Sequence, residues 1–314
     1  MSDTGSRSDA AASFEPHRRR LLGLAYRMLG SMSDGEDAVQ ETYLRWHRAD
    51  REKVVEPRAF LMTATTRICL DMLTSARARR EEYVGPWLPE PVFDTAALAP
   101  DSRAELAEDL SIALLVILDN LSPLERAAFL LHDVFDFSFS EVATALERSE
   151  GACRQLASRA RTEVRAARPR GATTLNARRA GLDPKHAQLM SAFAAATGAG
   201  DLSALMQLLA NDVRIVTDGG GKVRAALNAI EGAERVAKFL VEVTRKRPDA
   251  WWRDDFKLRP GSINGLPGLI VDSSNGPVQT TAFEIDGDVI RAIYIVRNPD
   301  KLRHLAPSTS AAQK

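Results

Sequence analysis

A run of prolines divides the chain and restricts its fold more than any other feature. Residues 85–100 contain four of them, Pro86, Pro89, Pro91 and Pro100. Proline has no amide hydrogen and its ring clashes with the preceding helical turn, so no helix can continue through this stretch. Helical patterns lie on both sides of it. The sequence therefore predicts two separate helical domains joined by a proline-rich linker.

The segment before the prolines has the pattern of a helical domain. Ser33 and Glu36 have the spacing of a capping box, which predicts that a helix begins there. Pro57 suits the first turn of a second, long helix with apolar residues at helical spacing. Residues 1–13 are expected to form a disordered tail.

The segment after the prolines carries two further capping boxes, at Ser122–Glu125 and Ser138–Glu141. The second box predicts a helix over residues 139–146, and a turn of three residues separates it from a helix that starts at Glu150. Two short helices with such a turn are typical of a helix-turn-helix. Residues 148–179 hold nine arginines and two glutamates, a local net charge of +7.

The pattern changes again after Leu182, where helical stretches alternate with β-rich runs. Glycines at 219–221 can adopt positive φ and reverse the chain after a strand over residues 213–217. Later apolar runs predict further strands, so we expect an α+β domain with a curved antiparallel sheet. The expected organisation is a tail (1–13), a helical domain (14–84), a proline-rich linker (85–104), a helix-turn-helix domain (105–170), a linker (171–182), an α+β domain (183–305) and a tail (306–314).

Composition excludes several classes of protein. The chain has 42 basic and 42 acidic residues, so it is not globally basic. Its apolar stretches are far shorter than a bilayer span, and its two cysteines, Cys69 and Cys153, cannot form a disulfide framework. We therefore expect a cytoplasmic protein. Motifs of hydrolases, zinc enzymes and phosphate loops are missing, which predicts no catalytic residue, no metal and no cofactor.

Arginines on two of the expected helices are candidates for DNA contact. On the helix from Glu150, arginine can fork onto guanine while other polar residues hold phosphates. The helix from Pro57 ends in a basic cluster that could follow a DNA strand. In both cases a solvated basic face, or arginines that stabilise a helix C-terminus, is the alternative. The candidates are Arg67, Asp71, Arg77, Arg80, Arg154, Ser158, Arg159 and Arg161.

The helix after Ser33 has a mixed acidic and polar face. Asp37, Gln40 and Glu41 would suit a basic protein partner, and a plain solvated face is again the alternative.

Short motifs in all parts of the chain resemble extracytoplasmic-function (ECF) sigma factors. Residues 37–46 resemble the helix of region 2 that binds core polymerase, and residues 67–71 resemble the promoter-reading helix that follows it. Residues 121–161 resemble region 4. The motifs at 87–91, 218–222 and 298–302 are similar to those of the subgroup with a C-terminal SnoaL-like extension.

This resemblance implies a function and its partners. Region 2 would bind core RNA polymerase and help to open the −10 promoter element, and region 4 would read −35 DNA. A cone-shaped SnoaL-like domain would modulate activity in cis, and a small ligand of that domain is left open. The regulatory positions that the motifs supply are Trp87, Pro89, Asp218, Gly219, Gly220, Gly221, Lys222, Asn298, Pro299, Asp300, Lys301 and Leu302.

Two other hypotheses belong to different classes. A helix-turn-helix regulator with a ligand-sensing domain would occupy DNA without polymerase. An enzyme that uses the cavity of the SnoaL-like domain would lose turnover when an acid or histidine there is replaced.

Overall fold

The computed structural model describes residues 3–81, 83–93, 112–167, 184–246 and 256–305. It divides into two compact units, one formed by residues 1–81 and 96–170 and the other by residues 82–95 and 171–314. The first part of the proline-rich linker thus belongs to the C-terminal unit. The rest of that linker, the linker at 171–182 and the tail at 306–314 lie outside the described residues.

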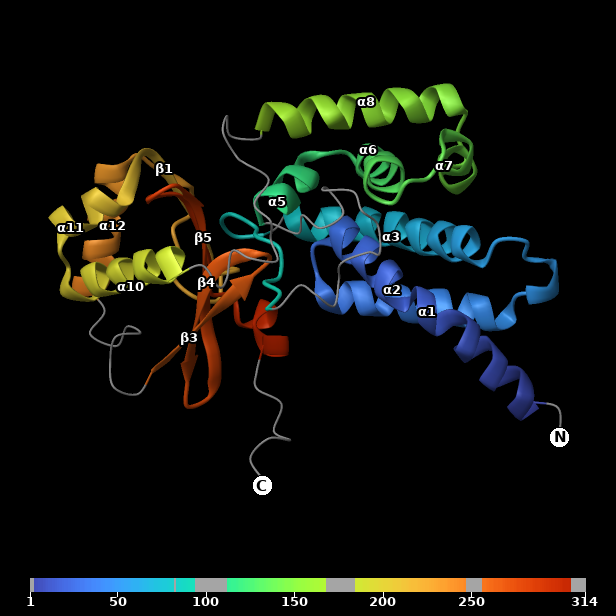
Figure 1. The fold of residues 1–314 in the computed structure, drawn as a ribbon, viewed down its shortest axis with the longest axis horizontal. Coiled ribbons are helices and arrows are strands. Elements are labelled where there is room, and N and C mark those ends of the chain that lie inside the picture. Colours follow the sequence, from blue (N-terminus) through green and yellow to red (C-terminus); the bar gives the residue numbers. More distant parts are fainter. Residues whose placement is uncertain (1–2, 82, 94–111, 168–183, 247–255, 306–314) are drawn as a thin grey trace. The chain divides into compact units, whose positions relative to one another are not determined.

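The first half of unit one consists of long helices (Figure 1). They are α1 (Asp3–Leu29), α2 (Met32–Arg48), the 3₁₀ turn η1 (Arg51–Lys53) and α3 (Pro57–Glu81). Their shared core contains Leu24, Tyr26, Trp46 and Leu61, all at most 2% exposed.

Two sequence predictions about these helices are wrong. The expected disordered tail is part of α1, which starts at Asp3; Ala10 is fully buried and Ser13 accepts a hydrogen bond from the indole of Trp46 at 3.1 Å. The cap of α2 is Ser31, whose side chain accepts from Asp34 N, so Ser33 lies inside the helix. Gly30, at φ 69°, follows the last residue of α1, and Ser31 after it has the extended conformation typical of a helix N-cap.

The second half of unit one contains the expected helix-turn-helix, formed by α7 and α8. The elements of this half are α5 (Ile112–Asn120), α6 (Pro123–Phe129), the π-helical turn η3 (Leu130–Val134), α7 (Phe139–Leu146) and α8 (Glu150–Ala167). Both predicted capping boxes, at Ser122 and Ser138, are present with reciprocal hydrogen bonds. Glu147 ends α7 in the left-handed conformation, and the Ser149 hydroxyl accepts from Ala152 N at the start of α8.

Unit two is an α+β domain, as predicted. Its helices are α10 (Pro184–Ala199), α11 (Leu202–Leu208) and α12 (Ala233–Lys246), and Figure 1 shows them gathered beside the sheet. The strands run in the order β2-β1-β6-β5-β4-β3. Their bounds are β1 Leu209–Asp218, β2 Ile230–Glu231, β3 Lys257–Ile263, β4 Leu266–Ser273, β5 Gly276–Asp286 and β6 Val289–Val296, followed by the 3₁₀ turns η4 Pro299–Lys301 and η5 Arg303–Leu305.

The sheet differs from the prediction in two ways. It is mixed rather than antiparallel, because β1 pairs with β6 in parallel. It also contains β3, which the sequence analysis missed because Pro260 and Gly261 interrupt its apolar pattern. The Asn264–Gly265 turn that joins β3 to β4 has positive φ at both residues (51° and 75°), the geometry of a tight hairpin.

The two faces of the sheet have different cover. Alternate residues such as Val213, Ile215, Phe283 and Ile293 point to the three helices and form the hydrophobic core. The opposite face includes Asp218, which is paired with Val296 and completely buried. Residues 83–93 contact this second face.

Candidate functional site

The described part of the linker, residues 83–93, lies across the second face of the sheet; we call it the linker segment. In the middle of the segment Leu88 N donates to Asp218 Oδ2 on β1 at 2.9 Å, and at its C-terminal end Phe93 forms a β-bridge with Ile263 on β3. β1 and β3 are four strand spacings apart, roughly 19 Å. The six residues from Leu88 to Phe93 can span at most about 20 Å, so this stretch must be extended. Pro89 and Pro91 fix their own φ and disfavour helical conformation in the residues before them, which favours the extended path.

A buried ion pair anchors the first half of the linker segment. Lys301 Nζ lies 2.8 Å from Asp218 Oδ2, with the two side chains 8% and 0% exposed. The same ammonium donates to Leu88 O at 2.5 Å and lies over the rings of Trp87 (4.2 Å) and Tyr83 (4.9 Å). The carboxylate, the carbonyl and the two aromatic faces offset part of the cost of removing this cation from water.

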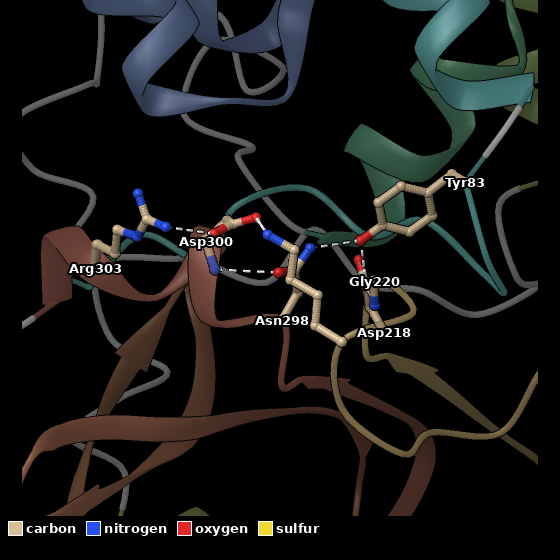
Figure 2. A network of polar contacts seen from close by, with 7 residues as sticks. Tyr83, Asp218, Gly220, Asn298, Asp300 and Arg303 are labelled. Carbon is tan, nitrogen blue, oxygen red and sulfur yellow. Dashed lines mark hydrogen bonds and ion pairs between the residues drawn. The ribbon is translucent and has the colours of Figure 1, made fainter.

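Asp218 collects donors from three segments of the chain. Its Oδ1 accepts from the Tyr83 hydroxyl at 2.5 Å and from Gly220 N at 3.0 Å. Asn298 Nδ2 donates in turn to the Tyr83 oxygen at 2.9 Å, an arrangement visible in Figure 2. Burial, and then the hydrogen bond to Asp218, raises the pKa of Tyr83. The phenol therefore stays protonated and acts as a donor to the carboxylate.

The glycines after Asp218 allow close approach of the other motifs. Gly220 has φ 58°, and a Cβ there would overlap the side-chain amide of Asn298. Gly221 has φ 69°, and a Cβ there would lie 3.2 Å from Val84 of the linker segment. A Cβ on Gly219 would overlap the carbonyl oxygen of Val223. A Cβ at 219 or 220 would thus overlap other atoms, and at 221 it would strain the backbone and crowd Val84.

The 298–302 motif closes the same cluster. Asn298 Oδ1 accepts from Asp300 N at 3.1 Å, and Pro299 begins η4, which brings Lys301 under the linker segment. Lys222 forms an ion pair with Asp300, and this contact lowers the pKa of Asp300. Leu302 is buried.

The structure thus brings the three predicted regulatory motifs together. Trp87 and Lys301 are in direct contact, while Pro89 is buried and Gly219–Gly221 and Asn298 surround Asp218. Sequence reasoning missed Tyr83, Asn264 and Phe93. Asn264 exchanges two hydrogen bonds with Val92, and its Asn-Gly turn was a signal that could have found it.

The predicted DNA-reading residues of α8 differ in their surroundings. Arg154, Ser158 and Arg159 are exposed, although Arg154 also pairs with Glu150 at 2.7 Å. Arg161 instead donates to Asp133 on η3 at 2.7 Å, a contact that holds α8 against its own domain.

The predicted DNA-binding and polymerase-binding residues of the first half also differ in their surroundings. Asp71 on α3 is exposed, whereas Arg67 is bound to the end of α7. Arg77 and Arg80 lie in α3, but their side chains are outside the described part. On α2, Asp37 and Gln40 are exposed and Glu41 pairs with Arg45 of the same helix at 3.3 Å.

Two helical bodies, the second a helix-turn-helix, followed by an α+β domain that binds the linker define a multidomain DNA-binding protein. Comparison with known proteins gives the family. Residues 14–79 match the model of sigma-70 region 2, and residues 111–164 match that of sigma-70 region 4.

Full-length relatives agree with these matches. The chain is 40% identical to the ECF RNA polymerase sigma factor SigJ of Mycobacterium tuberculosis, over 92% of this chain and 91% of the relative. It is 28% identical to the probable ECF sigma factor SigI of the same species, over 93% and 94%. The crystal structure of M. tuberculosis SigJ matches with a TM-score of 0.70 and 33% identity, covering 93% of this chain and 97% of that one. The chain belongs to the ECF RNA polymerase sigma factor family and is an alternative sigma factor.

No helix among the described residues is long and apolar enough to span a bilayer.

Proposed function

We propose that this sigma factor binds core RNA polymerase through α2 and promoter DNA through α3 and α8, and that the C-terminal unit modulates it through the linker segment. The protein has no chemistry of its own in this scheme; strand opening follows from capture of unpaired bases, which shifts the duplex equilibrium. The convergence of three distant motifs on Lys301 and Asp218 supports the modulation most directly.

The polymerase contact is assigned to Asp37, Gln40 and Glu41. They lie within five residues of one another on α2, and Asp37 and Gln40 are exposed. Burial of Ala38, Val39 and Thr42 fixes the rotation of the helix and leaves this face to solvent. An acidic face of this kind suits a basic surface on the polymerase.

The DNA contact on α8 is assigned to exposed residues and to one residue that also contacts its own domain. On α8 the exposed set is Arg154, Ser158 and Arg159, which can reach bases or phosphates. Arg161 stays a proposed DNA contact, but its bond to Asp133 also gives it a role within the domain.

Co-purification with core polymerase followed by run-off transcription tests the function. The full chain should start RNA chains in the presence of core enzyme, and Asp37→Arg should weaken core binding at least tenfold. Glu163→Arg, an exposed charge reversal on α8, is the control for core binding. An intact chain that neither binds core nor starts RNA chains would contradict the proposal.

Variants of α8 test the DNA assignment. Arg159→Ala should lower promoter affinity without changing thermal stability, because the side chain is exposed. Arg161→Ala should lower the melting temperature as well, since Asp133 loses its partner. If both substitutions changed stability and affinity equally, the distinction between Arg159 as a DNA contact alone and Arg161 as a contact that also stabilises the domain would be rejected.

Footprinting of promoter DNA without core polymerase separates a sigma factor from an ordinary DNA-binding regulator. Family membership does not favour the regulator.

A further inference from the structure

Arg67 of α3 connects the two DNA-binding halves of unit one. Its guanidinium uses all three nitrogens: Nε donates to Ala145 O at 3.1 Å, Nη2 to Thr144 O at 2.8 Å, and Nη1 lies 3.1 Å from Glu147 Oε1. These acceptors form the last turn of α7 and the first residue of the turn before α8. The carbonyls at a helix C-terminus lack partners within the helix and carry partial negative charge, so they bind a cation well.

Two other arginines bridge the same halves and also donate to main-chain carbonyls. Arg58, at the start of α3, donates to Phe135 O at 2.7 Å and lies 5.3 Å from the ring centre of Phe137. Arg126 on α6 donates to Met28 O, at the end of α1, at 2.5 Å. Region 2 and region 4 are thus joined by arginines that contact carbonyls at the ends of helices and in a loop.

Beside these polar contacts α3 and α7 are incompletely packed. A cleft of about 480 Å³ is lined by residues of both helices. Phe60, Thr63 and Arg67 line it from α3, Glu141 and Thr144 from α7, and Arg45 from α2. Since dispersion contacts are lost across a cleft, apolar packing contributes little to this part of the interface and the polar contacts hold it.

The closed arrangement cannot be the one that works on a promoter. Elements at −35 and −10 are 25 base pairs apart, roughly 85 Å along the duplex. Arg67 on α3, in the half assigned to the −10 element, lies within hydrogen-bond distance of the helix-turn-helix assigned to the −35 element. The two halves must separate before both elements can be bound.

We propose that Arg67 is an intramolecular lock: in the free protein it caps α7 and keeps regions 2 and 4 closed, and binding to core polymerase requires that this contact break. The same side chain is withheld from DNA while the lock is closed. This inference rests on the proposed function, because the need to open follows from simultaneous binding of two promoter elements.

The lock affects core binding through the population of the open form. When a partner binds only the open form, its apparent affinity is reduced by the fraction of chains that are open. Loss of the Arg67 contact should raise that fraction without any change at Asp37 or Gln40.

Fluorescence energy transfer in the full chain measures the lock directly. Dyes are placed at Arg48→Cys on α2 and Glu163→Cys on α8, both exposed positions. The native Cys69 and Cys153 are fully buried, so a maleimide reacts at the introduced thiols. The free wild-type chain should show mainly one high-transfer population. Arg67→Met should lower the closed-to-open ratio about tenfold, as expected for loss of charge-assisted hydrogen bonds.

Two further variants make the result specific. Glu147→Gln removes only the ion pair with Arg67 Nη1 and leaves the two hydrogen bonds to α7 carbonyls in place. It should therefore lower the closed-to-open ratio by a smaller factor than Arg67→Met. Arg159→Met removes an exposed arginine that takes no part in the lock and should leave the ratio unchanged. Circular dichroism checks that each variant retains its helices.

Titration with bacterial core RNA polymerase completes the test. Arg67→Met should reach half-saturation at a severalfold lower core concentration than the wild type. An unchanged closed-to-open ratio in Arg67→Met overturns the lock, and so does an opened variant that binds core no better. If neither the wild type nor Arg67→Met binds core polymerase, the proposed function fails. The energy-transfer measurement on the free chains still shows whether Arg67 holds the closed form.

Discussion

Asp218 and Lys301 depend on each other because both charges are removed from water. Asp218 also accepts hydrogen bonds from Tyr83, Leu88 and Gly220, and Lys301 also contacts the Leu88 carbonyl and two aromatic faces. Loss of either charge removes the ion pair while the other charge stays buried, so each single substitution should be costly.

Asp218→Asn should destabilise the C-terminal unit by about 3–5 kcal/mol, because it removes the carboxylate that pairs with a buried ammonium. Lys301→Met should also destabilise it, and the double variant should cost less than the sum of the two. Urea unfolding of the full chain measures the free energies. Asp288→Asn, an exposed acid in the β5–β6 turn, is the control. Additive effects of the two substitutions would show that the side chains act independently.

The Tyr83 phenol gives the same cluster a dependence on alkaline pH. Its pKa is raised in the folded protein, so its contribution is complete below the unfolded value near 10 and falls as the pH rises above it. The stability advantage of the wild type over Tyr83→Phe should therefore shrink between pH 9 and pH 11. Urea unfolding at both pH values measures it. An advantage that grows with pH would contradict the assigned proton position.

At the scale of elements, local signals in the sequence predicted most helices of the second half. Ser122 and Ser138 carry their partners three residues away, and these boxes fix where α6 and α7 begin. Contacts distant in sequence could not be predicted from spacing alone: the start of α1 depends on packing of Ala10, and β3 depends on pairing with β4. The motif resemblance pointed to residues 87–91, 218–222 and 298–302, but their convergence on Asp218 and the contact with Tyr83 required the fold.

The glycine turn after β1 allows two costs of a substitution to be separated: backbone strain at positive φ, and overlap of the added Cβ with neighbouring atoms. Gly220 and Gly287 have nearly the same φ, 58° and 61°, but only Gly220 faces other atoms, since a Cβ at Gly287 would meet nothing within 4 Å. Gly287→Ala should therefore cost about 1 kcal/mol from backbone strain alone. Gly220→Ala should cost clearly more, because Asn298 must move away from Tyr83. Thermal unfolding compares the stability of the two variants. Equal losses of stability would mean that Asn298 can move aside at no energetic cost.

At the scale of the whole molecule, the proposed modulation would pass through the linker segment, which follows α3 by one residue in the sequence and precedes α5. Leu88 and Val92 are 1% and 7% exposed, so the segment is held by apolar burial as well as by the ion pair. Under the proposed modulation, release of this segment would change the constraint on the chain between regions 2 and 4.

Deletion of residues 183–314 should therefore alter transcription from a cognate promoter severalfold, because it removes the sheet face that covers Leu88 and Val92. Lys301→Met weakens the same attachment without removing the domain and should change output in the same direction by a smaller factor. Run-off transcription with core polymerase measures both, with Asp288→Asn as the control. Unchanged output after the deletion would refute modulation in cis. A deletion effect with no effect of Lys301→Met would show that modulation does not pass through the ion pair, since the pair holds Leu88, Trp87 and Tyr83 in one place.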